Sequence, residues 1–364
     1  MAAPTVGSVE AKRSTAAVTA PSKKYRDPFI DNAKFLAIAL VAIGHFVGPV
    51  LNEPLGAATF VTIFTFHMPA FVFIAGYLSR GFKGTPKQAQ RVVTTIVAPY
   101  LVFEISYEVF LSAIRGNSIK LDVLNPSYAM WFLAALFFWR LSAPVWRAMK
   151  PSVAIAAAVA ISLGSAAMDL PGVLDLHRML GFLPFFVAGL VLPLDRYFAF
   201  VRRLRTRALG TVGLAGFFVA TYFLHPHTTA WLYYSKSYSE LGVSTLTGLA
   251  NRSLMLILGC VMTTAFLAVV PRRQLWFTAL GAGTLYVYVL HRFIVKAGTG
   301  PDGLYDSWEW LHTPLGVVAI VAFGFGVTVV LSSAPVRALF RPLVEPRLEW
   351  LFRRETDASS SGRG

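Results

Sequence analysis

Long apolar stretches separated by short polar connections make up most of the chain after residue 29. A helix of about 20 residues crosses a hydrocarbon layer of about 30 Å. The stretches lack the two-residue alternation of barrel strands, so helices remain the way to satisfy their backbone in lipid. We therefore predict an all-α, polytopic membrane protein with ten helices, at roughly 30–51, 57–78, 92–113, 129–146, 152–169, 174–193, 208–225, 245–270, 276–298 and 314–334.

The chain divides into three parts on this pattern. Residues 1–29 are polar, lack the apolar core of a secretory signal, and are expected to form a disordered cytoplasmic leader. Residues 30–334 form the membrane domain. Residues 335–364 form a basic cytoplasmic tail, in which 335–354 alternate Arg with apolar residues and suit an amphipathic segment at the interface. The last ten residues are expected to be disordered.

Composition excludes several classes of protein. The chain is 55% hydrophobic and 14% charged, against about 25% charged in soluble domains. A soluble enzyme, a disordered chain and a fibrous protein are therefore excluded. The single cysteine, Cys260, excludes a disulfide framework and Cys-based zinc or iron–sulfur sites.

The net charge of +15 follows the predicted topology. With the N-terminus inside, 24 of the 33 Lys and Arg residues lie on the cytoplasmic side, five on the opposite side and four within helices. Cytoplasmic connections of membrane proteins are enriched in these residues, so we expect both termini to be cytoplasmic and the protein to lie in the plasma membrane. Attraction to anionic membrane lipid explains the surplus without nucleic acid.

Ionisable residues within the apolar stretches need partners or a function, because each costs at least ~2.5–3.5 kcal/mol at mid-helix. Lys34 and His45 are eleven residues apart, which brings them within about 20° on one helix face and about 16 Å apart along it. Asp31 lies within about 60° of the same face. We expect Asp31 to pair with Lys34 near the cytosol, and His45 to lie in the outer half.

Two further histidines are expected at a similar depth. His67 lies in mid-helix next to Pro69, which kinks the helix, and His291 lies in the ninth helix. A structural hydrogen bond is the alternative role for each histidine. No metal site is expected, since the HxxxH and HExxH patterns are absent, and His225 and His227 are expected to be solvated in an outer loop.

Other buried charges have weaker assignments. Glu104 near mid-span suits an ion pair or a proton relay, and Arg178 suits substrate binding as well as a structural role. Arg140 and Arg292 are expected to form ion pairs or to reach the interface. Phosphate-binding glycine loops, GxSxG and dinucleotide-binding patterns are absent from the chain.

The Lys34–x10–His45 spacing in DNAKFLAIALVAIGH resembles the Arg–x10–His signature of membrane acyltransferase family 3. It is most similar to the fucose 4-O-acetylase-like branch, in which Lys commonly replaces Arg. That replacement leaves a point charge where Arg has a bidentate fork. The resemblance continues, in the family's order over residues 26–334, through FHMPAFVFIAGYLSRG, RVVTTIVAPY, YAMWFL, RMLGFLPFFVAGL and GAGTLYVYVLH.

The resemblance implies a ten-helix enzyme that moves an acyl group, usually acetyl, from cytoplasmic acyl-CoA to a hydroxyl of a carbohydrate or glycolipid acceptor. It implies acetyl-CoA as co-substrate and no permanently bound cofactor. Together with the buried charges, it makes His45, Asp31 and His67 the catalytic candidates and Lys34 and Arg91 the acyl-CoA-binding candidates. The acceptor-binding candidates are Arg178, His291, Tyr288, Glu104 and Trp131.

The mechanism expected from these residues uses Lys34 and Arg91 to receive the phosphates of coenzyme A, and His45 as general base toward the acceptor hydroxyl. The alternative is a proton-coupled transporter or exporter of a glycan or small molecule, with the same histidines and Glu104 as a relay. Transporters commonly contain two related halves, and no such repeat is visible here, which favours the enzyme. A receptor or scaffold leaves the buried charges unexplained.

Overall fold

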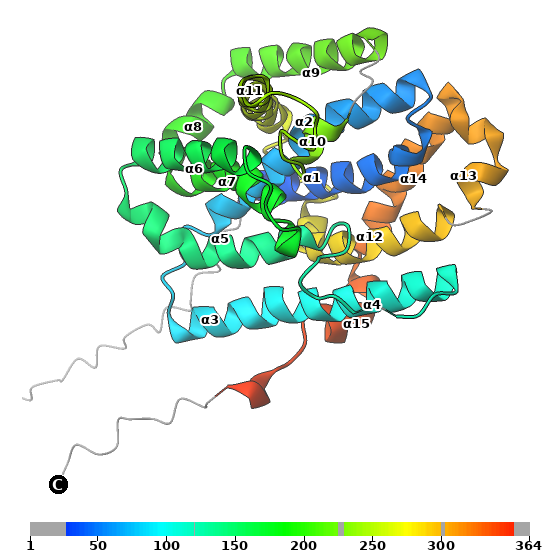
Figure 1. The fold of residues 1–364 in the computed structure, drawn as a ribbon, viewed down its shortest axis with the longest axis horizontal. Helices are drawn as coiled ribbons and strands as arrows, with labels where there is room; N and C mark the ends of the chain where they lie inside the picture. The colour runs from blue at the N-terminus through cyan, green and yellow to red at the C-terminus, as the bar shows by residue number, and fades with distance from the viewer. Residues whose placement is uncertain (1–26, 120, 225–228, 300–302, 353–364) are drawn as a thin grey trace, which may run out of the picture.

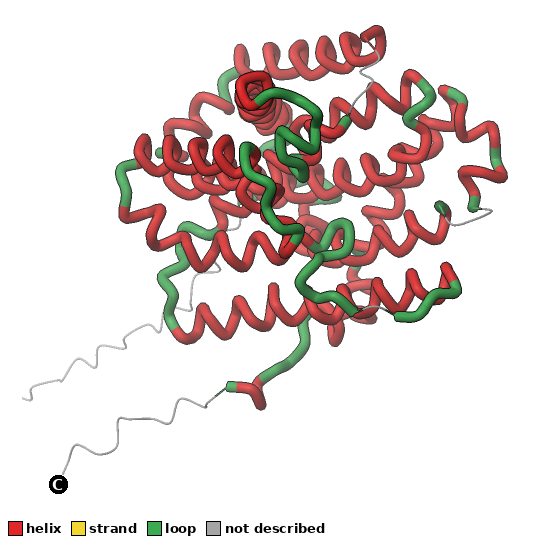
Figure 2. Tube along the Cα trace, viewed as in Figure 1, coloured by secondary structure: helices red, strands yellow, loops and turns green. Residues whose placement is uncertain are grey.

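The computed structural model describes residues 27–119, 121–224, 229–299 and 303–352 of the chain. Helices and their connections make up these residues, with no β-strand among them (Figure 2). The predicted all-α class is therefore confirmed. Most of the predicted leader, His225, His227 and the last ten residues lie outside the described residues.

Every predicted apolar stretch contains one long helix. These helices are α1 (Pro28–Val47), α2 (Pro54–Leu78), α4 (Ala98–Arg115), α5 (Trp131–Ala148), α6 (Pro151–Ala166), α7 (Leu176–Val191), α9 (Leu204–Leu224), α11 (Thr245–Val269), α12 (Thr284–Gly298) and α14 (Pro314–Leu331). The shorter elements are η1 (Gly48–Val50), α3 (Pro86–Val92), the π-helical turn η2 (Val93–Val97), η3 (Val173–Asp175), α8 (Leu194–Val201), α10 (Ala230–Tyr233), η4 (Thr278–Ala282), α13 (Leu304–Ser307), η5 (Glu309–His312), α15 (Ala334–Val344) and η6 (Glu349–Leu351).

Within the described residues, seven helical segments are long and apolar enough to cross a membrane. They are Pro28–Val50, Pro54–Leu78, Pro86–Arg115, Val173–Val191, Leu204–Leu224, Thr245–Val269 and Pro314–Leu331. The helices α6 and α12 have only 16 and 15 residues, and α5 contains Arg140 and Arg147. The chain is thus a multi-pass membrane protein, and the count of ten spans stays a prediction.

Two predicted helix limits differ most from the structure. The third helix begins at Pro86 instead of residue 92, because the Thr85 hydroxyl accepts a hydrogen bond from the Gln88 amide and Pro86 occupies the first helical position. The ninth begins at Thr284 instead of 276, after the separate 3-10 turn η4. This turn packs directly on α1: a Cβ at Gly281 would lie 2.3 Å from the Asp31 carbonyl oxygen.

Several long helices, among them α1, α4, α5, α9 and α12, run roughly across the view of Figure 1, with connections gathered at two ends, whereas α11 is seen nearly end-on. At one end lie the start of α3 and the turn between α5 and α6, on the left of the figure. At the other lie the turn between α1 and α2 and the short helix α13, on the right. We refer to these as the α3 end and the α13 end.

The helices α1 and α2 occupy the interior of the bundle. The most apolar part of each is 67% and 72% buried, against 11% for the peripheral α9. Asp27 begins α1 by accepting a hydrogen bond from the Phe29 amide (3.0 Å), and Glu53 begins α2 by accepting one from the Gly56 amide (2.7 Å). The two helices that carry His45 and His67 are therefore the most enclosed of the seven apolar segments.

Two glycines allow α2 and α7 to approach closely. A Cβ added to Gly76 would lie 2.1 Å from the carbonyl oxygen of Phe186, and one added to Gly189 would lie 2.1 Å from that of Phe73. Small residues at helix contacts let the backbones meet in a membrane, where packing drives association. This crossing sets the distance between His67 on α2 and the α7 residues described below.

Replacing Gly189 with Ala should therefore separate α2 from α7 and destabilise the protein by about 1–3 kcal/mol, the usual cost of overpacking. Thermal unfolding of the detergent-solubilised protein measures the change. The matched control is Gly213→Ala on α9, where an added Cβ meets nothing within 4 Å and the substitution should be neutral or stabilising. Equal thermal stability of the two variants would contradict the close contact.

Candidate functional site

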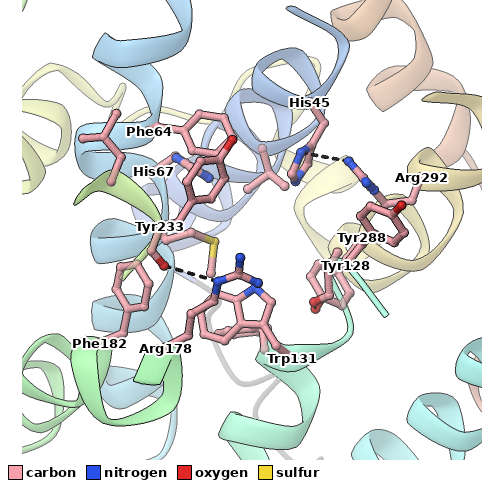
Figure 3. Close-up of a pocket in the computed structure, with 15 residues that line it drawn as sticks. His45, Phe64, His67, Tyr128, Trp131, Arg178, Phe182, Tyr233, Tyr288 and Arg292 are labelled. Carbon is pink, nitrogen blue, oxygen red and sulfur yellow. Dashed lines mark hydrogen bonds between the residues drawn. The ribbon is translucent and has the colours of Figure 1, made fainter. Parts of the chain in front are cut away.

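A cavity of about 350 Å³ lies between α1, α2, α5, α7 and α12 (Figure 3). We call it the central cavity. Its polar lining consists of the side chains of His45, His67, Arg178 and Arg292, together with tyrosine hydroxyls. The apolar walls are formed mainly by Phe64, Trp131, Phe132, Phe182, Tyr233 and Tyr288. A few convergent polar groups in an aromatic enclosure are typical of a small-molecule site.

His45 is held between two residues of α12. The Nη1 atom of Arg292 lies 3.1 Å from His45 Nδ1, and the ring of His291 stacks against the His45 ring with centroids 5.3 Å apart. His291 is completely buried, and its Nδ1 lies 2.8 Å from the carbonyl oxygen of Val287. His291 thus supports His45 from behind and is not part of the cavity lining.

His67 enters the cavity from α2. Its Nδ1 lies 2.8 Å from the Ile63 carbonyl oxygen, one helical turn earlier. The Phe64 ring lies edge-on to both imidazoles, with its centroid 4.5 Å from that of His67 and 5.7 Å from that of His45. The three rings form one side of the cavity, across from Arg178 and Trp131 (Figure 3).

Arg178, at the start of α7, closes the cavity opposite the histidines. Its Nη1 forms a 2.7 Å ion pair with Asp175, and its Nε donates to the Tyr233 carbonyl oxygen at 3.3 Å. The guanidinium also lies 5.8 Å from the ring centroids of Trp131 and Tyr233. Arg178 is thus oriented by a carboxylate and two aromatic rings, with part of its donor capacity left for a ligand.

The connection that supplies Tyr233 is anchored to α6. Asp169 accepts hydrogen bonds from the hydroxyls of Ser237 (2.6 Å) and Ser239 (2.5 Å), and these bonds lower the pKa of Asp169. Tyr238 is buried and donates its hydroxyl to the Leu163 carbonyl oxygen. The wall next to Arg178 is therefore held in place by contacts at the end of α6.

A second cavity of about 220 Å³ lies nearer the α3 end and is lined by Lys34, Thr95 and Arg140. We call it the Lys34 cavity. Lys34 forms a 2.7 Å ion pair with Asp31, as the sequence indicated. The Lys34 cavity shares Phe132 and Tyr288 with the central cavity. These two side chains form the wall between the cation and the imidazoles.

Tyr288 is fixed in that wall by its hydroxyl, which donates to the Ala129 carbonyl oxygen. It is 4% exposed and lines both cavities. The π-helical turn η2 places Thr95 at the opposite side of the Lys34 cavity. Pro99 explains that turn, since it has no N–H for the carbonyl of Thr95, and such turns recur at functional sites.

The series of cavities extends to both ends of the bundle. A groove at the α3 end, the Arg91 groove, is lined by Lys87, Arg91 and Arg347 and shares Thr95 with the Lys34 cavity. At the α13 end a cavity of about 420 Å³, the Lys296 cavity, shares His45, Phe64, Tyr233 and Arg292 with the central cavity. Four neighbouring hollows therefore lie in series between the two ends, each sharing lining residues with the next.

Apart from His291, which lies behind His45, and Glu104, the predicted site residues fall into three groups. His45, His67, Arg178, Trp131 and Tyr288 meet at the central cavity, while Lys34 and Arg91 line the two hollows toward the α3 end. Asp31 contacts the site through Lys34.

Glu104 lies elsewhere. Its Oε1 accepts a hydrogen bond from the Ser127 amide at 2.8 Å, in the connection before α5. Glu104 is 1% exposed and lines none of the four hollows. Glu104 therefore helps to hold the connection that leads to Trp131 at the start of α5.

Arg292, Tyr128 and Tyr233 were missed as site residues. Arg292 was expected to form an ion pair or to reach the interface, but no carboxylate lies within ion-pairing distance among the described residues. Its guanidinium instead contacts His45 and lies 4.7 Å from the centroid of the Tyr128 ring. The sequence did contain a signal for Arg292. It directly follows the candidate residue His291 and lies four residues after Tyr288, one helical turn away.

A metal centre finds no support in the described part of the chain, where no group of three or more His, Cys, Asp or Glu side chains is placed to hold an ion. The imidazoles are instead engaged by backbone carbonyls, an arginine and aromatic rings. The arrangement offers two imidazoles and two guanidiniums to one small ligand. It suits proton transfer and stabilisation of negative charge.

Comparison with known protein families gives a match over most of the chain. A family model described as an acyltransferase domain, that of membrane acyltransferase family 3, matches residues 27–333. This range covers most of the chain, including α1 through α14 and every residue of the central cavity. No curated protein and no solved structure matches the chain.

Single cysteines in a Cys260→Ser background should test whether the end hollows are open to water. We expect Lys296→Cys to react with a membrane-impermeant maleimide from outside intact cells, and Arg91→Cys to react only in inverted vesicles, as the distribution of basic residues predicts. Val261→Cys on the exposed apolar face of α11 is the control and should react from neither side. Labelling of Arg91→Cys from outside would reverse the orientation.

Proposed function

The chain belongs to membrane acyltransferase family 3, and from that premise we propose that it is an O-acyltransferase that uses acyl-CoA as donor. The transferred group is acetyl, and the acceptor is a hydroxyl of a carbohydrate or glycolipid at the outer face of the plasma membrane. Both termini are cytoplasmic in this proposal, so the α3 end faces the cytoplasm. The Lys34–His45 spacing supports a position in the fucose 4-O-acetylase-like branch.

The observation that carries this proposal is the series of hollows linked by shared lining residues. Acyl-CoA is made in the cytoplasm, whereas the acceptor is on the other side, so the two substrates need separate approaches to one reaction site. The Lys34 cavity and the Lys296 cavity supply those approaches, and each borders the central cavity. An enzyme whose two substrates both come from the same side of the membrane would not need a cavity at each end of the bundle.

The donor side has the charges that coenzyme A requires. Lys87, Arg91 and Arg347 line the Arg91 groove, and Lys34 and Arg140 line the next cavity. Phosphate groups pair readily with Arg and Lys. We place the nucleotide phosphates in the groove and the pantetheine arm in the narrower Lys34 cavity, whose walls are mostly apolar. The thioester then reaches the wall formed by Phe132 and Tyr288.

The acceptor side has a different character. Trp131 and Tyr233 present aromatic faces, and Arg178 and Tyr128 present donors, around the central cavity. Aromatic faces with a few convergent polar groups suit a sugar ring, which has apolar faces and hydroxyl edges. We propose Arg178, Trp131 and Tyr288 as acceptor contacts. His291 and Glu104 then act indirectly, through His45 and the connection before α5.

The chemistry needs a group that accepts the proton of the acceptor hydroxyl. An imidazole in this role contributes about 10²–10⁴-fold in rate. His45 and His67 are the imidazoles that line the central cavity, and the sequence favours His45. Asp31 lies at the other end of α1 and acts on the donor side through Lys34.

A proton-coupled transporter remains the second candidate, because linked hollows that reach both ends of a bundle also suit alternating access. Purified protein given acetyl-CoA and an acceptor should release free thiol if it is the enzyme. A transporter would release none, and would instead exchange substrate or protons across vesicles.

Replacing His45 with Ala should lower acetyl transfer by at least about 100-fold, because an imidazole that contacts the reacting groups contributes about that much to the rate. The measurement is thiol release from acetyl-CoA by purified protein. Size-exclusion chromatography in detergent provides the control, because the variant should remain inserted and monodisperse. Turnover at the wild-type rate would refute a role for His45.

Replacing Lys34 or Arg91 with Ala should raise the KM for acetyl-CoA by about tenfold or more, because a hydrogen bond to a charged group contributes about 1.5–3 kcal/mol. The kcat should change little, since neither side chain reaches the thioester. Arg205→Ala, an exposed basic residue of α9, is the matched control and should leave the KM unchanged. A fall in kcat at constant KM would contradict the donor-side assignment.

A further inference from the structure

The hydrogen-bond partner of His45 determines which of its nitrogens carries the proton. A guanidinium has donors and no acceptor. The contact of 3.1 Å between Arg292 Nη1 and His45 Nδ1 therefore requires a lone pair on Nδ1. Neutral His45 then carries its proton on Nε2, and the atom that remains for a ligand is a donor.

The charges around His45 oppose its protonation as well. An imidazolium at this position would bring its positive charge within 3.1 Å of the Arg292 nitrogen and lose the hydrogen bond. Arg292 has no carboxylate partner among the described residues, and its Nε lacks a hydrogen bond there. Like charges this close repel strongly away from water. His45 is thus poorly placed to receive a proton from the acceptor.

His67 has the opposite arrangement. A carbonyl oxygen only accepts, so the contact of 2.8 Å between His67 Nδ1 and the Ile63 carbonyl oxygen requires a proton on Nδ1. The lone pair of neutral His67 is then on Nε2, and no hydrogen bond within the described chain occupies that atom. The other cation of the cavity, Arg178, is compensated by Asp175 at 2.7 Å, so positive charge on His67 is less strongly opposed.

We infer that His67 is the general base and that His45 is the donor that stabilises the oxyanion, an assignment that rests on the acyl transfer proposed above. His67 Nε2 takes the proton of the acceptor hydroxyl as its oxygen attacks the thioester carbonyl carbon. The carbonyl electron pair moves to its oxygen, which accepts a hydrogen bond from His45 Nε2–H. The oxyanion electron pair then re-forms the carbonyl bond as the C–S bond breaks, and the coenzyme A thiolate takes the proton from His67. The products are the acyl ester and free thiol, and both histidines return to their starting state.

Arg292 is the positioning residue in this scheme. It does not contact the reacting atoms, but its Nη1 keeps the proton of His45 on Nε2, while His291 packs behind the ring. Donors held toward the site of developing negative charge are among the largest contributors to catalysis, at about 10²–10³-fold each. The strict requirement on His45 is therefore a hydrogen-bond donor, whereas on His67 it is a proton acceptor.

Nitrogen-15 NMR of histidine-labelled, full-length wild-type protein tests the proton positions directly. We expect a protonated Nε2 and a bare Nδ1 for His45, and the reverse for His67. The signals are assigned by their loss in His45→Gln and His67→Gln. A His45 that carries its proton on Nδ1 would overturn the inference whether or not the protein is active.

Acetyl transfer tests the roles, with acetyl-CoA as donor and octyl β-D-glucoside as the acceptor probe. Gln at position 45 keeps an acceptor for Arg292 and an N–H for the oxyanion, so His45→Gln should stay within about tenfold of wild type, while His45→Ala loses about 10²–10³-fold. His67→Gln and His67→Ala should both lose about 10²–10⁴-fold, since neither side chain takes a proton. His312→Gln, at an exposed position outside the cavity, is the matched control.

The results distinguish a wrong assignment of the histidines from a failure of the proposed acyl transfer. If His45→Gln is as inactive as His45→Ala while His67→Gln keeps its activity, His45 is the base and the inference is wrong. If the wild-type protein transfers no acetyl group, the proposed function fails, and the NMR result still decides the proton positions. Arg292→Gln should move the His45 proton toward a mixture of both nitrogens, and an unchanged spectrum would contradict its positioning role.

Discussion

The hydrogen bond between Arg292 and His45 joins a buried guanidinium to an imidazole that lines two cavities inside the helix bundle. Polar groups in such surroundings are stable only when they are paired, so this contact sets how α12 packs against α1. His291, on the same helix, stacks behind the imidazole. Through these contacts α12 decides the orientation of His45 and the chemical character of the atom it presents to the cavity.

The helix packing that surrounds this contact accounts for the two approaches to the site. The close crossing of α2 and α7 at Gly76 and Gly189 brings His67 near Arg178, and the anchored connection after α9 adds Tyr233. Phe132 and Tyr288 then form a thin wall between the Lys34 cavity and the central cavity. In the proposed reaction this wall keeps the thioester of the donor from water while its carbonyl carbon stays within reach of the acceptor.

The division of work between the histidines follows from their partners alone. Both side chains are imidazoles on interior helices, but one nitrogen of His45 faces an obligatory donor and one nitrogen of His67 faces an obligatory acceptor. In the inferred mechanism the same side chain is therefore a donor in one place and a base in the other. The Lys34–His45 spacing places both side chains on one face of α1, and it leaves the direction of proton transfer open.

The sequence alone determined the helical class, the position of each long helix and the common face of Asp31, Lys34 and His45, because hydrophobicity and the 100° helical step are local properties. Helix limits were wrong where local caps or glycine contacts intervened, at Pro86 and Thr284. Only the tertiary structure decided that Arg292 contacts His45, that His291 lies behind His45 and that Glu104 accepts a hydrogen bond from the connection before α5. Those outcomes depend on which helices become neighbours, and the spacing of residues along one helix carries no information about the partner on another.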